Sequence, residues 1–288
     1  MKLVSLLPLL FSMLILGACS GLPEKESARS GRLVVAADRQ LSELTSMQAE
    51  FFSRYYTDAR VSLSSSESAK TLAALLEGKA GAALIDGELL AREDSLFATF
   101  KRPLLSEPVA RDGIVFIVNR GYSSKKLSLG ELGALFSDSP KGVTPLVSAD
   151  NYRMLGVFAS RAAIRRSDLR VSACKSDLEL LERVASDKRF VGLMFRSSFE
   201  ASRIAGGAGE AVRLLPLAAR SGDVAFFPSR QAIFDGSYPL VTTVSYVYYP
   251  GDALAAGFGA WLGSRGQKLF ESSQLVPVRQ MERTVNIK

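Results

Sequence analysis

The sequence predicts an α/β fold in which a parallel sheet is covered by helices. In the first part of the chain, short apolar runs that suit buried strands alternate with segments of helical period. Alternation of this kind favours a parallel sheet with helices on its faces. Hydrophobic residues make up 47% of the 288 residues. The chain can therefore bury one large core or the cores of two lobes of ordinary size.

The strand–helix alternation is clearest between residues 33 and 85. The first helix carries Leu41, Leu44 and Phe52 near helical spacing, and Gly78 is a typical C-terminal stop for the second. We expect strands over residues 33–37, 59–64 and 81–85 and helices over residues 41–56 and 67–77.

The rest of the chain continues with strongly apolar strands and shorter helices. Ser128 is the expected cap of a helix because its hydroxyl can accept a hydrogen bond from a backbone N–H of the first turn. We expect strands over residues 113–119, 144–148, 190–195 and 239–249, helices over residues 129–136, 154–163, 178–186 and 253–270, and an extended tail over residues 275–287.

The N-terminus predicts export and a lipid anchor. Lys2 precedes an apolar run, residues 6–16, and the sequence Leu16-Gly17-Ala18-Cys19 follows. The run is shorter than the roughly 20 residues that a transmembrane helix needs, so it is typical of a signal peptide. We expect a signal peptide over residues 1–18, acylation of Cys19, by palmitate among other acyl groups, and a polar tether over residues 19–30. The alternative is an ordinary signal peptide with a chance cysteine.

Composition and charge exclude several classes of function. Removal of the expected signal peptide takes away Lys2 and leaves 35 basic residues against 29 acidic ones. Because the basic residues are dispersed along the chain, we expect no nucleic-acid partner. The chain contains no histidine, which excludes Ser-His-Asp and Cys-His catalysis and every zinc site that uses histidine. Only Cys174 would remain free after acylation of Cys19, so no intrachain disulfide is expected. We predict no enzyme activity, cofactor or metal.

Five stretches, in this order, resemble the phosphate-binding proteins of ABC transporters, within the type 2 periplasmic binding proteins. Residues 190–194 (Phe-Val-Gly-Leu-Met), for example, are similar to the family's Ile-Gly-Tyr strand. The stretches are residues 107–119, 127–136, 190–194, 235–240 and 266–278. The resemblance implies an α/β, two-lobed periplasmic-binding-protein-like fold, each lobe a mixed sheet flanked by helices. The first lobe would comprise residues 31–116 and 240–288, and the second residues 117–239.

The resemblance also places the ligand in the cleft between the lobes, where three loops and one strand end should meet. In open α/β sheets, ligands bind beyond the carboxyl ends of the strands, close to helix N-termini. Arg39, in the first loop, could donate to an anion, although Asp38 could instead cap a helix while Arg39 points to solvent. The expected ligand-binding residues are Arg39, Ser64, Ser65, Ser66, Asp86, Asn151, Tyr152 and Arg153.

The sequence departs from the family where phosphate should bind. The Gly-Ser-Gly-Thr run expected near residues 148–153 is missing, while the scaffold stretches are kept. Asp86 could accept a proton from a protonated phosphate but would repel a dianion. Two hypotheses follow. One is a lipid-anchored, extracytoplasmic solute-binding protein that delivers phosphate or another small oxyanion, or another polar ligand, to an ABC permease. The other is an envelope or surface adaptor or assembly lipoprotein that binds an envelope protein and no phosphate; in an enteric-type cell, Ser20 after Cys19 would favour the outer membrane.

Overall fold

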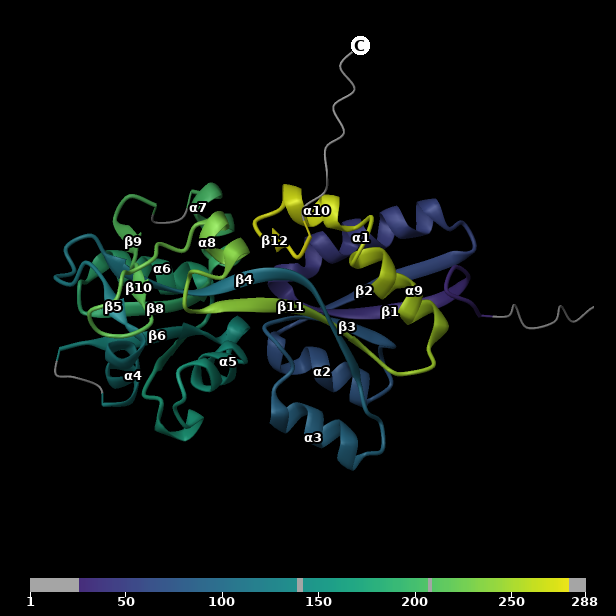
Figure 1. Cartoon of the computed structure of the whole chain (residues 1–288), viewed down its shortest axis with the longest axis horizontal. Helices are drawn as coiled ribbons and strands as arrows, with labels where there is room; N and C mark the ends of the chain where they lie inside the picture. The colour runs from purple at the N-terminus through teal and green to yellow at the C-terminus, as the bar shows by residue number, and fades with distance from the viewer. Residues whose placement is uncertain (1–25, 139–141, 207–208, 280–288) are drawn as a thin grey trace, which may run out of the picture.

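The computed structural model describes residues 26–138, 142–206 and 209–279 and shows two lobes joined by long strands (Figure 1). The predicted signal peptide, Cys19 and most of the tether lie outside the described residues. The strand order is β2-β1-β3-β11-β4-β8-β6-β7, so one mixed sheet runs through both lobes. The α/β fold predicted from the sequence is confirmed.

The first lobe is built on three parallel strands, β1 (Gly31–Asp38), β2 (Ala59–Ser66) and β3 (Ala82–Asp86). Strand β1 lies between the other two, and its side chains alternate between two hydrophobic cores. Helices α1 (Ser42–Tyr55), α9 (Ala253–Leu262) and α10 (Gln267–Ser272) lie on one side of the sheet, and α2 (Ser68–Leu76) and α3 (Ala91–Thr99) lie on the other (Figure 1).

The second lobe repeats this layered plan with shorter strands. Strands β6 (Thr144–Ser148), β7 (Ser172–Cys174) and β8 (Phe190–Phe195) are parallel, and β9 (Val212–Leu214) joins the same sheet through β4. A two-stranded sheet pairs β5 (Leu127–Ser128) with β10 (Leu217–Ala218). The helices are α4 (Leu129–Ser137), α5 (Met154–Arg161), α6 (Asp177–Ser186), α7 (Arg196–Ile204) and α8 (Arg230–Asp235).

Two antiparallel strands connect the lobes. Strand β4 (Leu105–Asn119) pairs with β11 (Val241–Tyr248) through its first half and with β8 through its second half. The short strand β12 (Val276–Pro277) pairs with the middle of β4. The lobes therefore share a continuous backbone ladder, and the carboxyl ends of β1, β3 and β6 face the boundary between them (Figure 1).

Most predicted elements are present, and one predicted helix is wrong. The structure divides the helix expected over residues 253–270 into α9 and α10. At the break, the Gly266 carbonyl accepts a hydrogen bond from Gln48 Nε2 (2.9 Å), and Gln48 Oε1 accepts one from Trp261 Nε1 (3.0 Å). Satisfying these buried groups stabilises the interruption. The cap predicted at Ser128 is confirmed, as part of a capping box with Glu131.

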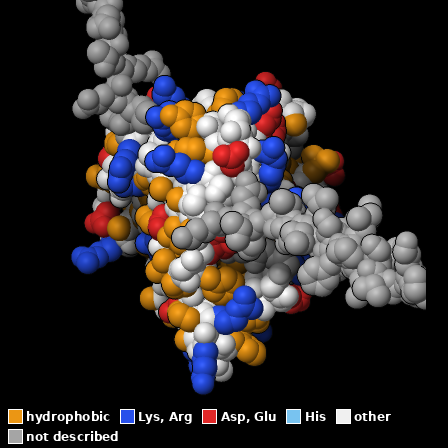
Figure 2. All heavy atoms as spheres, turned by 90° about the vertical axis from the view of Figure 1, so that its right-hand side faces the viewer, with side chains coloured by type: hydrophobic (Ala, Val, Ile, Leu, Met, Phe, Trp, Pro, Cys, Tyr) orange, Lys and Arg blue, Asp and Glu red, His pale blue; other side chains and the backbone are white. Residues whose placement is uncertain are grey.

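The surface of the first lobe carries a mixture of side chains. In the end-on view of this lobe, basic, acidic and hydrophobic side chains are interspersed (Figure 2). Within residues 26–138, 142–206 and 209–279, no helix is both long and apolar enough to span a bilayer. The same described residues contain no cluster of histidine, cysteine and acidic side chains that could hold a metal ion.

Candidate functional site at the boundary between the lobes

Buried polar side chains gather where β1, β3 and β6 end. Strands with apolar interiors end here in polar residues, and the chain then turns into the next helix or loop. These carboxyl ends are where open α/β sheets bind ligands. The buried polar residues at the boundary are Asp38, Ser68, Asp86, Asp112, Ser148, Asn151, Arg153, Ser197, Ser198 and Thr242.

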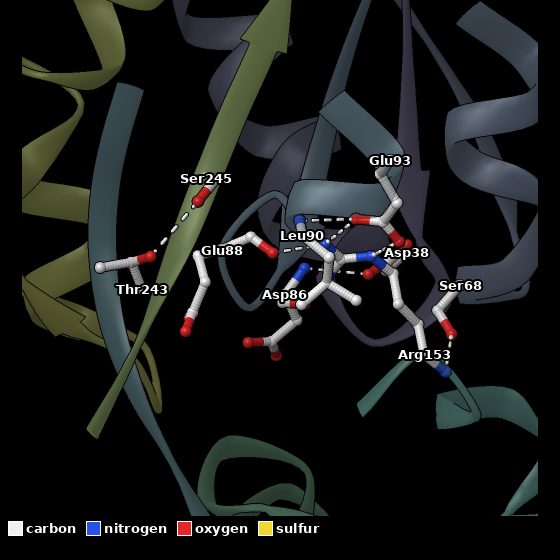
Figure 3. Close-up of polar contacts among 9 residues, drawn as sticks. All are labelled: Asp38, Ser68, Asp86, Glu88, Leu90, Glu93, Arg153, Thr243 and Ser245. Atoms are coloured by element: carbon white, nitrogen blue, oxygen red, sulfur yellow. Dashed lines mark hydrogen bonds and ion pairs between the residues drawn. The ribbon is translucent and has the colours of Figure 1, made fainter. Parts of the chain in front are cut away.

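Arg153, just before α5 of the second lobe, inserts its side chain into the first lobe (Figure 3). Its Nη1 donates to the Asp86 carbonyl (2.7 Å), and Nη2 also donates to the Glu88 carbonyl. The Glu93 carboxylate accepts from Nε (2.9 Å) and from Nη2 (2.7 Å). Arg153 is 4% exposed. Its guanidinium thus joins the lobes by a fork-shaped, charge-assisted contact.

The backbones on either side of this contact approach closely. A Cβ atom on Gly87 would lie 2.7 Å from Val157 Cγ2, and one on Gly156 would lie 2.7 Å from Leu90 Cδ1. The Arg153 N–H also donates to Ser68 Oγ (3.4 Å). Larger residues at these glycines would separate α5 from the β3–α3 loop, so the structure represents a closed arrangement of the lobes.

A second group at the boundary consists of buried carboxylates. Asp38 Oδ2 accepts a hydrogen bond from the Asp86 N–H (2.9 Å), so the Asp38 side chain ties β1 to β3. It does not cap the following helical turn. The Asp86 side chain points away from the Arg153 guanidinium, and both of its oxygens lack a hydrogen-bond partner among the described residues (Figure 3).

Burial raises the pKa of all three buried acids at the boundary. For Asp86 the rise in pKa is large, because the charges of Asp112 and Asp38 add to the effect of burial. The nearby Gln40 amide acts to lower the pKa of Asp86, although the two side chains make no hydrogen bond of normal geometry. Burial raises the pKa of Asp112 to about 6, against the effect of hydrogen bonds from Ser197 and Gly113. Desolvation disfavours the charged form of each carboxyl. This part of the boundary therefore favours ligands that donate hydrogen bonds or carry positive charge.

Several other buried atoms near Asp86 lack hydrogen-bond partners among the described residues. A cavity of about 460 Å³ lies between α1 and α7, and both Gln40 and Ser198 line it. Thr242 is opposite Asp112 in the ladder between β11 and β4. The unpartnered atoms of this group are Asp38 Oδ1, both oxygens of Asp86, the Gln40 amide, Asn151 Oδ1, Ser198 Oγ and Thr242 Oγ1. Buried polar groups are normally paired, so this cluster is typical of a site that a polar ligand or water completes.

The structure brings three of the predicted site residues to the boundary. Arg153 Nη1 meets the Asp86 carbonyl there (2.7 Å), and the Asn151 amide donates to both oxygens of Asp177 (3.2 Å each). Tyr152 is exposed and supports the Arg166 guanidinium, whose carbon lies 4.8 Å from the ring centre. Arg153 is engaged with protein groups in this closed state.

Of the other predicted residues, Arg39, Ser64 and Ser65 lie on the surface of the first lobe, whereas Ser66 is half-buried beside Asp38 in the β1–β2 ladder. Arg39 is exposed, and its Nη2 lies 3.9 Å from Glu67. Ser64 and Ser65 are exposed at the end of β2, where Ser65 Oγ lies 2.5 Å from Ser42 Oγ. Ser66 Oγ pairs with Thr71 Oγ1 (3.1 Å). Neither Ser65 nor Ser66 is the N-cap of α2, because the helix begins after Glu67.

Sequence reasoning missed several members of the site. Gln40 follows β1 in the first loop, next to Arg39. Its position after a strand was therefore a signal that could have identified it as a site residue. Asp112 interrupts an apolar strand, which is an unusual place for a charge and was a usable signal. Ser198 and Thr242 carry no local signal, because only the tertiary arrangement places α7 and β11 beside the end of β3.

Comparisons with known proteins agree with this geometry. A model of the family described as PBP superfamily domain matches residues 22–265. No curated protein sequence matches the chain. A candidate phosphate ABC transporter substrate-binding protein from Clostridium perfringens, with phosphate bound, is similar in structure with a TM-score of 0.67 at 13% identity. The match covers 86% of this chain and 100% of that one.

Two further solved structures show the same fold. An ABC-type phosphate transport receptor from Vibrio cholerae gives a TM-score of 0.64 at 15% identity and covers 85% of this chain and 99% of that one. A sulfate-bound regulatory domain of OxyR2 from Vibrio vulnificus gives a TM-score of 0.54 at 10% identity, and the match covers 85% of this chain and 99% of that one. At these identities the likeness concerns the fold, whereas the family model spans most of the sequence. The chain belongs to the PBP superfamily domain family, with the two-lobed type 2 fold of its phosphate-binding structural neighbours.

Proposed function

We propose that this protein is an extracytoplasmic solute-binding protein that closes two lobes on a small oxyanion for uptake by an ABC-type importer. The main support for this proposal is the cluster of buried polar atoms around Asp86, at the carboxyl ends of the strands, that lack hydrogen-bond partners among the described residues. Solute-binding relatives by fold support it, and the names of two structural neighbours point to phosphate. We take residues 31–116 with 240–288 as the first lobe and residues 117–239 as the second. No enzymatic activity is part of the proposal.

The charges at the boundary restrict the form of the oxyanion. Arg153 is engaged by Glu93, and Arg196 donates to the carbonyls of Pro228 (2.8 Å) and Gln274 (2.9 Å). The unfilled positions around Asp86 are mostly acceptors. A fully ionised oxyanion would meet buried carboxylates there and be repelled, whereas a protonated one donates its O–H to a carboxylate. We therefore propose monobasic phosphate, or a similar acid anion, as the preferred ligand.

Calorimetry with phosphate tests this proposal. Binding should be at least about tenfold tighter near pH 5.5 than near pH 8.5, because high pH ionises both Asp86 and the ligand. Sulfate, which carries no proton at either pH, should bind more weakly than phosphate. The Asp86→Asn variant should lose the part of this pH dependence that comes from Asp86 and keep the part that comes from ionisation of the ligand. Absence of heat and of any thermal shift with phosphate, phosphonate and sulfate at both pH values would exclude the oxyanion.

A second candidate function is favoured by the Arg153 contact. The guanidinium of Arg153 holds the two lobes closed by contacts within the protein itself. A protein that is fixed in this way does not need to close on a solute, which supports an envelope or surface adaptor without phosphate binding. Crosslinking in cells followed by affinity purification separates the two functions. Recovery of a permease supports uptake, and recovery of envelope or surface proteins without a permease supports the adaptor.

The proposed location is the cell envelope, with the chain held to a membrane through an acylated Cys19. Support comes from the sequence before residue 20 and from the extracytoplasmic character of the periplasmic binding family. Labelling cells with a fatty acid should mark the full chain, and the Cys19→Ala variant should lose the label. An unlabelled full chain would contradict the anchor but not the solute-binding proposal.

A further inference from the structure

A second cavity opens at the seam between the lobes, on the side of the sheet where α2 and α3 lie. Its volume is about 270 Å³. Leu72, Leu76 and Phe97 of the first lobe supply an apolar wall, and Tyr152 of the second lobe supplies an aromatic face. Most small-molecule sites combine an apolar lining with a few convergent polar groups, and this cavity has the dimensions of a small organic molecule.

Two arginines from different lobes converge on this cavity. Arg92 lies in the first turn of α3, and Arg166 begins the 3₁₀ turn η3 (Arg166–Asp168) in the second lobe. A methyl group built on Gly156 would lie 3.3 Å from Arg92 Nη2 and 3.8 Å from Arg166 Nη1. The two guanidinium groups therefore approach the same point from opposite sides of the seam.

No carboxylate among the described residues compensates these two charges. Arg166 stacks on Tyr152 and donates to its carbonyl (3.5 Å), and Arg92 makes no hydrogen bond or ion pair within the described part of the chain. Glu93 also lines the cavity, but both of its oxygens accept from Arg153. Two like charges held near one another are unfavourable until an anion lies between them.

We propose that Arg92 and Arg166 form an anion site at the seam, which takes a small organic anion with a carboxylate or phosphate head and an apolar body. The head receives the two guanidinium forks, which match the geometry of carboxylate and phosphate oxygens. The body lies between Tyr152 and the apolar wall formed by Leu72 and Phe97. Because each lobe contributes one arginine, the bound anion also holds the lobes together.

This site is separate from the proposed phosphate site and does not depend on it. The cavity between α1 and α7 has the opposite electrostatic character, since its charged lining residues are Glu43 and Asp177. An organic anion should therefore bind at the seam, where the arginines attract it, and not in the α1–α7 cavity, where these carboxylates repel it. The buried carboxylates lie toward the α1–α7 cavity, since Asp112 accepts a hydrogen bond from the N–H of Ser197, which lines that cavity.

Calorimetry of the full chain with phenyl phosphate and with benzoate tests the site. Arg92→Gln and Arg166→Gln should each weaken phenyl phosphate binding by about tenfold or more, while Arg32→Gln, on an exposed arginine of β1, should leave it unchanged. Benzyl alcohol, which lacks the charge, should not bind. Asp86→Asn should leave phenyl phosphate binding intact, which separates this result from a failure of the phosphate site.

A charge-reversal variant provides a second readout. Arg92→Glu places a carboxylate beside Arg166, so it should raise the melting temperature while abolishing phenyl phosphate binding. Unchanged phenyl phosphate affinity in both glutamine variants would overturn the proposal. So would the absence of binding by both phenyl phosphate and benzoate at millimolar concentration, or a lower melting temperature for Arg92→Glu.

Discussion

Asp112 shows how one buried carboxyl can set the pH dependence of stability. It lies on the connecting strand β4, is 1% exposed, and accepts hydrogen bonds from the Gly113 N–H (2.8 Å) and the Ser197 N–H (3.2 Å). Burial raises its pKa from 3.8 to about 6. The folded state therefore holds its proton more tightly than the unfolded state, and folding is favoured where the carboxyl is neutral.

We expect the Asp112 contribution to stability to be complete below about pH 4 and to be lost as the pH rises through about 6. Asp112→Asn keeps an acceptor for both N–H groups and removes the titration. It should raise the free energy of unfolding near pH 7.5 by about 1–3 kcal/mol and flatten the pH slope. Urea unfolding near pH 4.5 and pH 7.5 measures this effect. Asp58→Asn, at an exposed site, should leave the slope unchanged, and an unchanged slope in Asp112→Asn would contradict the prediction.

At the residue scale, sequence reasoning located the strand ends better than the side chains that act together. Asp86, Asn151 and Arg153 were predictable because each follows a recognisable strand, and such positions meet at one edge of a sheet. The engagement of Arg153 by Glu93 was not predictable, because these residues are 60 positions apart on different lobes. Ser64 and Ser65 follow the same rule as Asp86, yet β2 is at the edge of the sheet, so its end is exposed.

At the scale of single elements, α9 provides a docking face for the N-terminal segment. A turn over residues 27–30 precedes β1, and Ser27 and Ser30 exchange backbone hydrogen bonds. A Cβ atom on Gly257 would lie 2.0 Å from the Ala28 carbonyl oxygen. The segment can therefore lie against α9 only because residue 257 has no side chain.

Gly257→Ala should displace this segment and lower the free energy of unfolding by about 1–3 kcal/mol, as overpacking against backbone does. Gly130→Ala is the matched control, since it lies in an exposed position of α4 with nothing within 4 Å of its Cβ position. It should stabilise the protein by about 0.4–1 kcal/mol. Thermal and urea unfolding of both variants give the comparison, and equal effects of the two alanines would show that the segment does not pack on α9.

Elements with strong periodicity were predictable, and those defined by tertiary contacts were not. Strands β6 and β8 match their predicted bounds because each is a short apolar run between polar turns. Helix α3 was missed, since it buries only Phe97 and thus lacks an apolar stripe. The break between α9 and α10 was missed because the Gln48 side chain, far away in the sequence, supplies its hydrogen bonds.

At the scale of the whole molecule, the relative stability of open and closed lobes depends on Arg153. The guanidinium is buried among Glu93 and two backbone carbonyls, so opening the lobes leaves these groups to be hydrated again. Arg161 and Glu88 form a second contact across the seam (2.7 Å), but both side chains are partly exposed. Exposed pairs contribute little, about 0–1 kcal/mol. Closure should therefore respond strongly to Arg153 and weakly to Arg161.

We expect Arg153→Met to open the lobes and to lower the free energy of unfolding by about 1.5–3 kcal/mol, because the half-buried Glu93 carboxylate loses the charge-assisted hydrogen bonds that it accepts from the guanidinium. Small-angle X-ray scattering should give a larger radius of gyration for this variant than for the parent chain, and Arg161→Gln should match the parent. The double variant Arg153→Met with Glu93→Leu should recover stability, since no unpaired charge remains, but should stay open. If Arg153→Met keeps the parent's radius of gyration, the arginine does not control closure, and the two connecting strands fix the lobes by themselves.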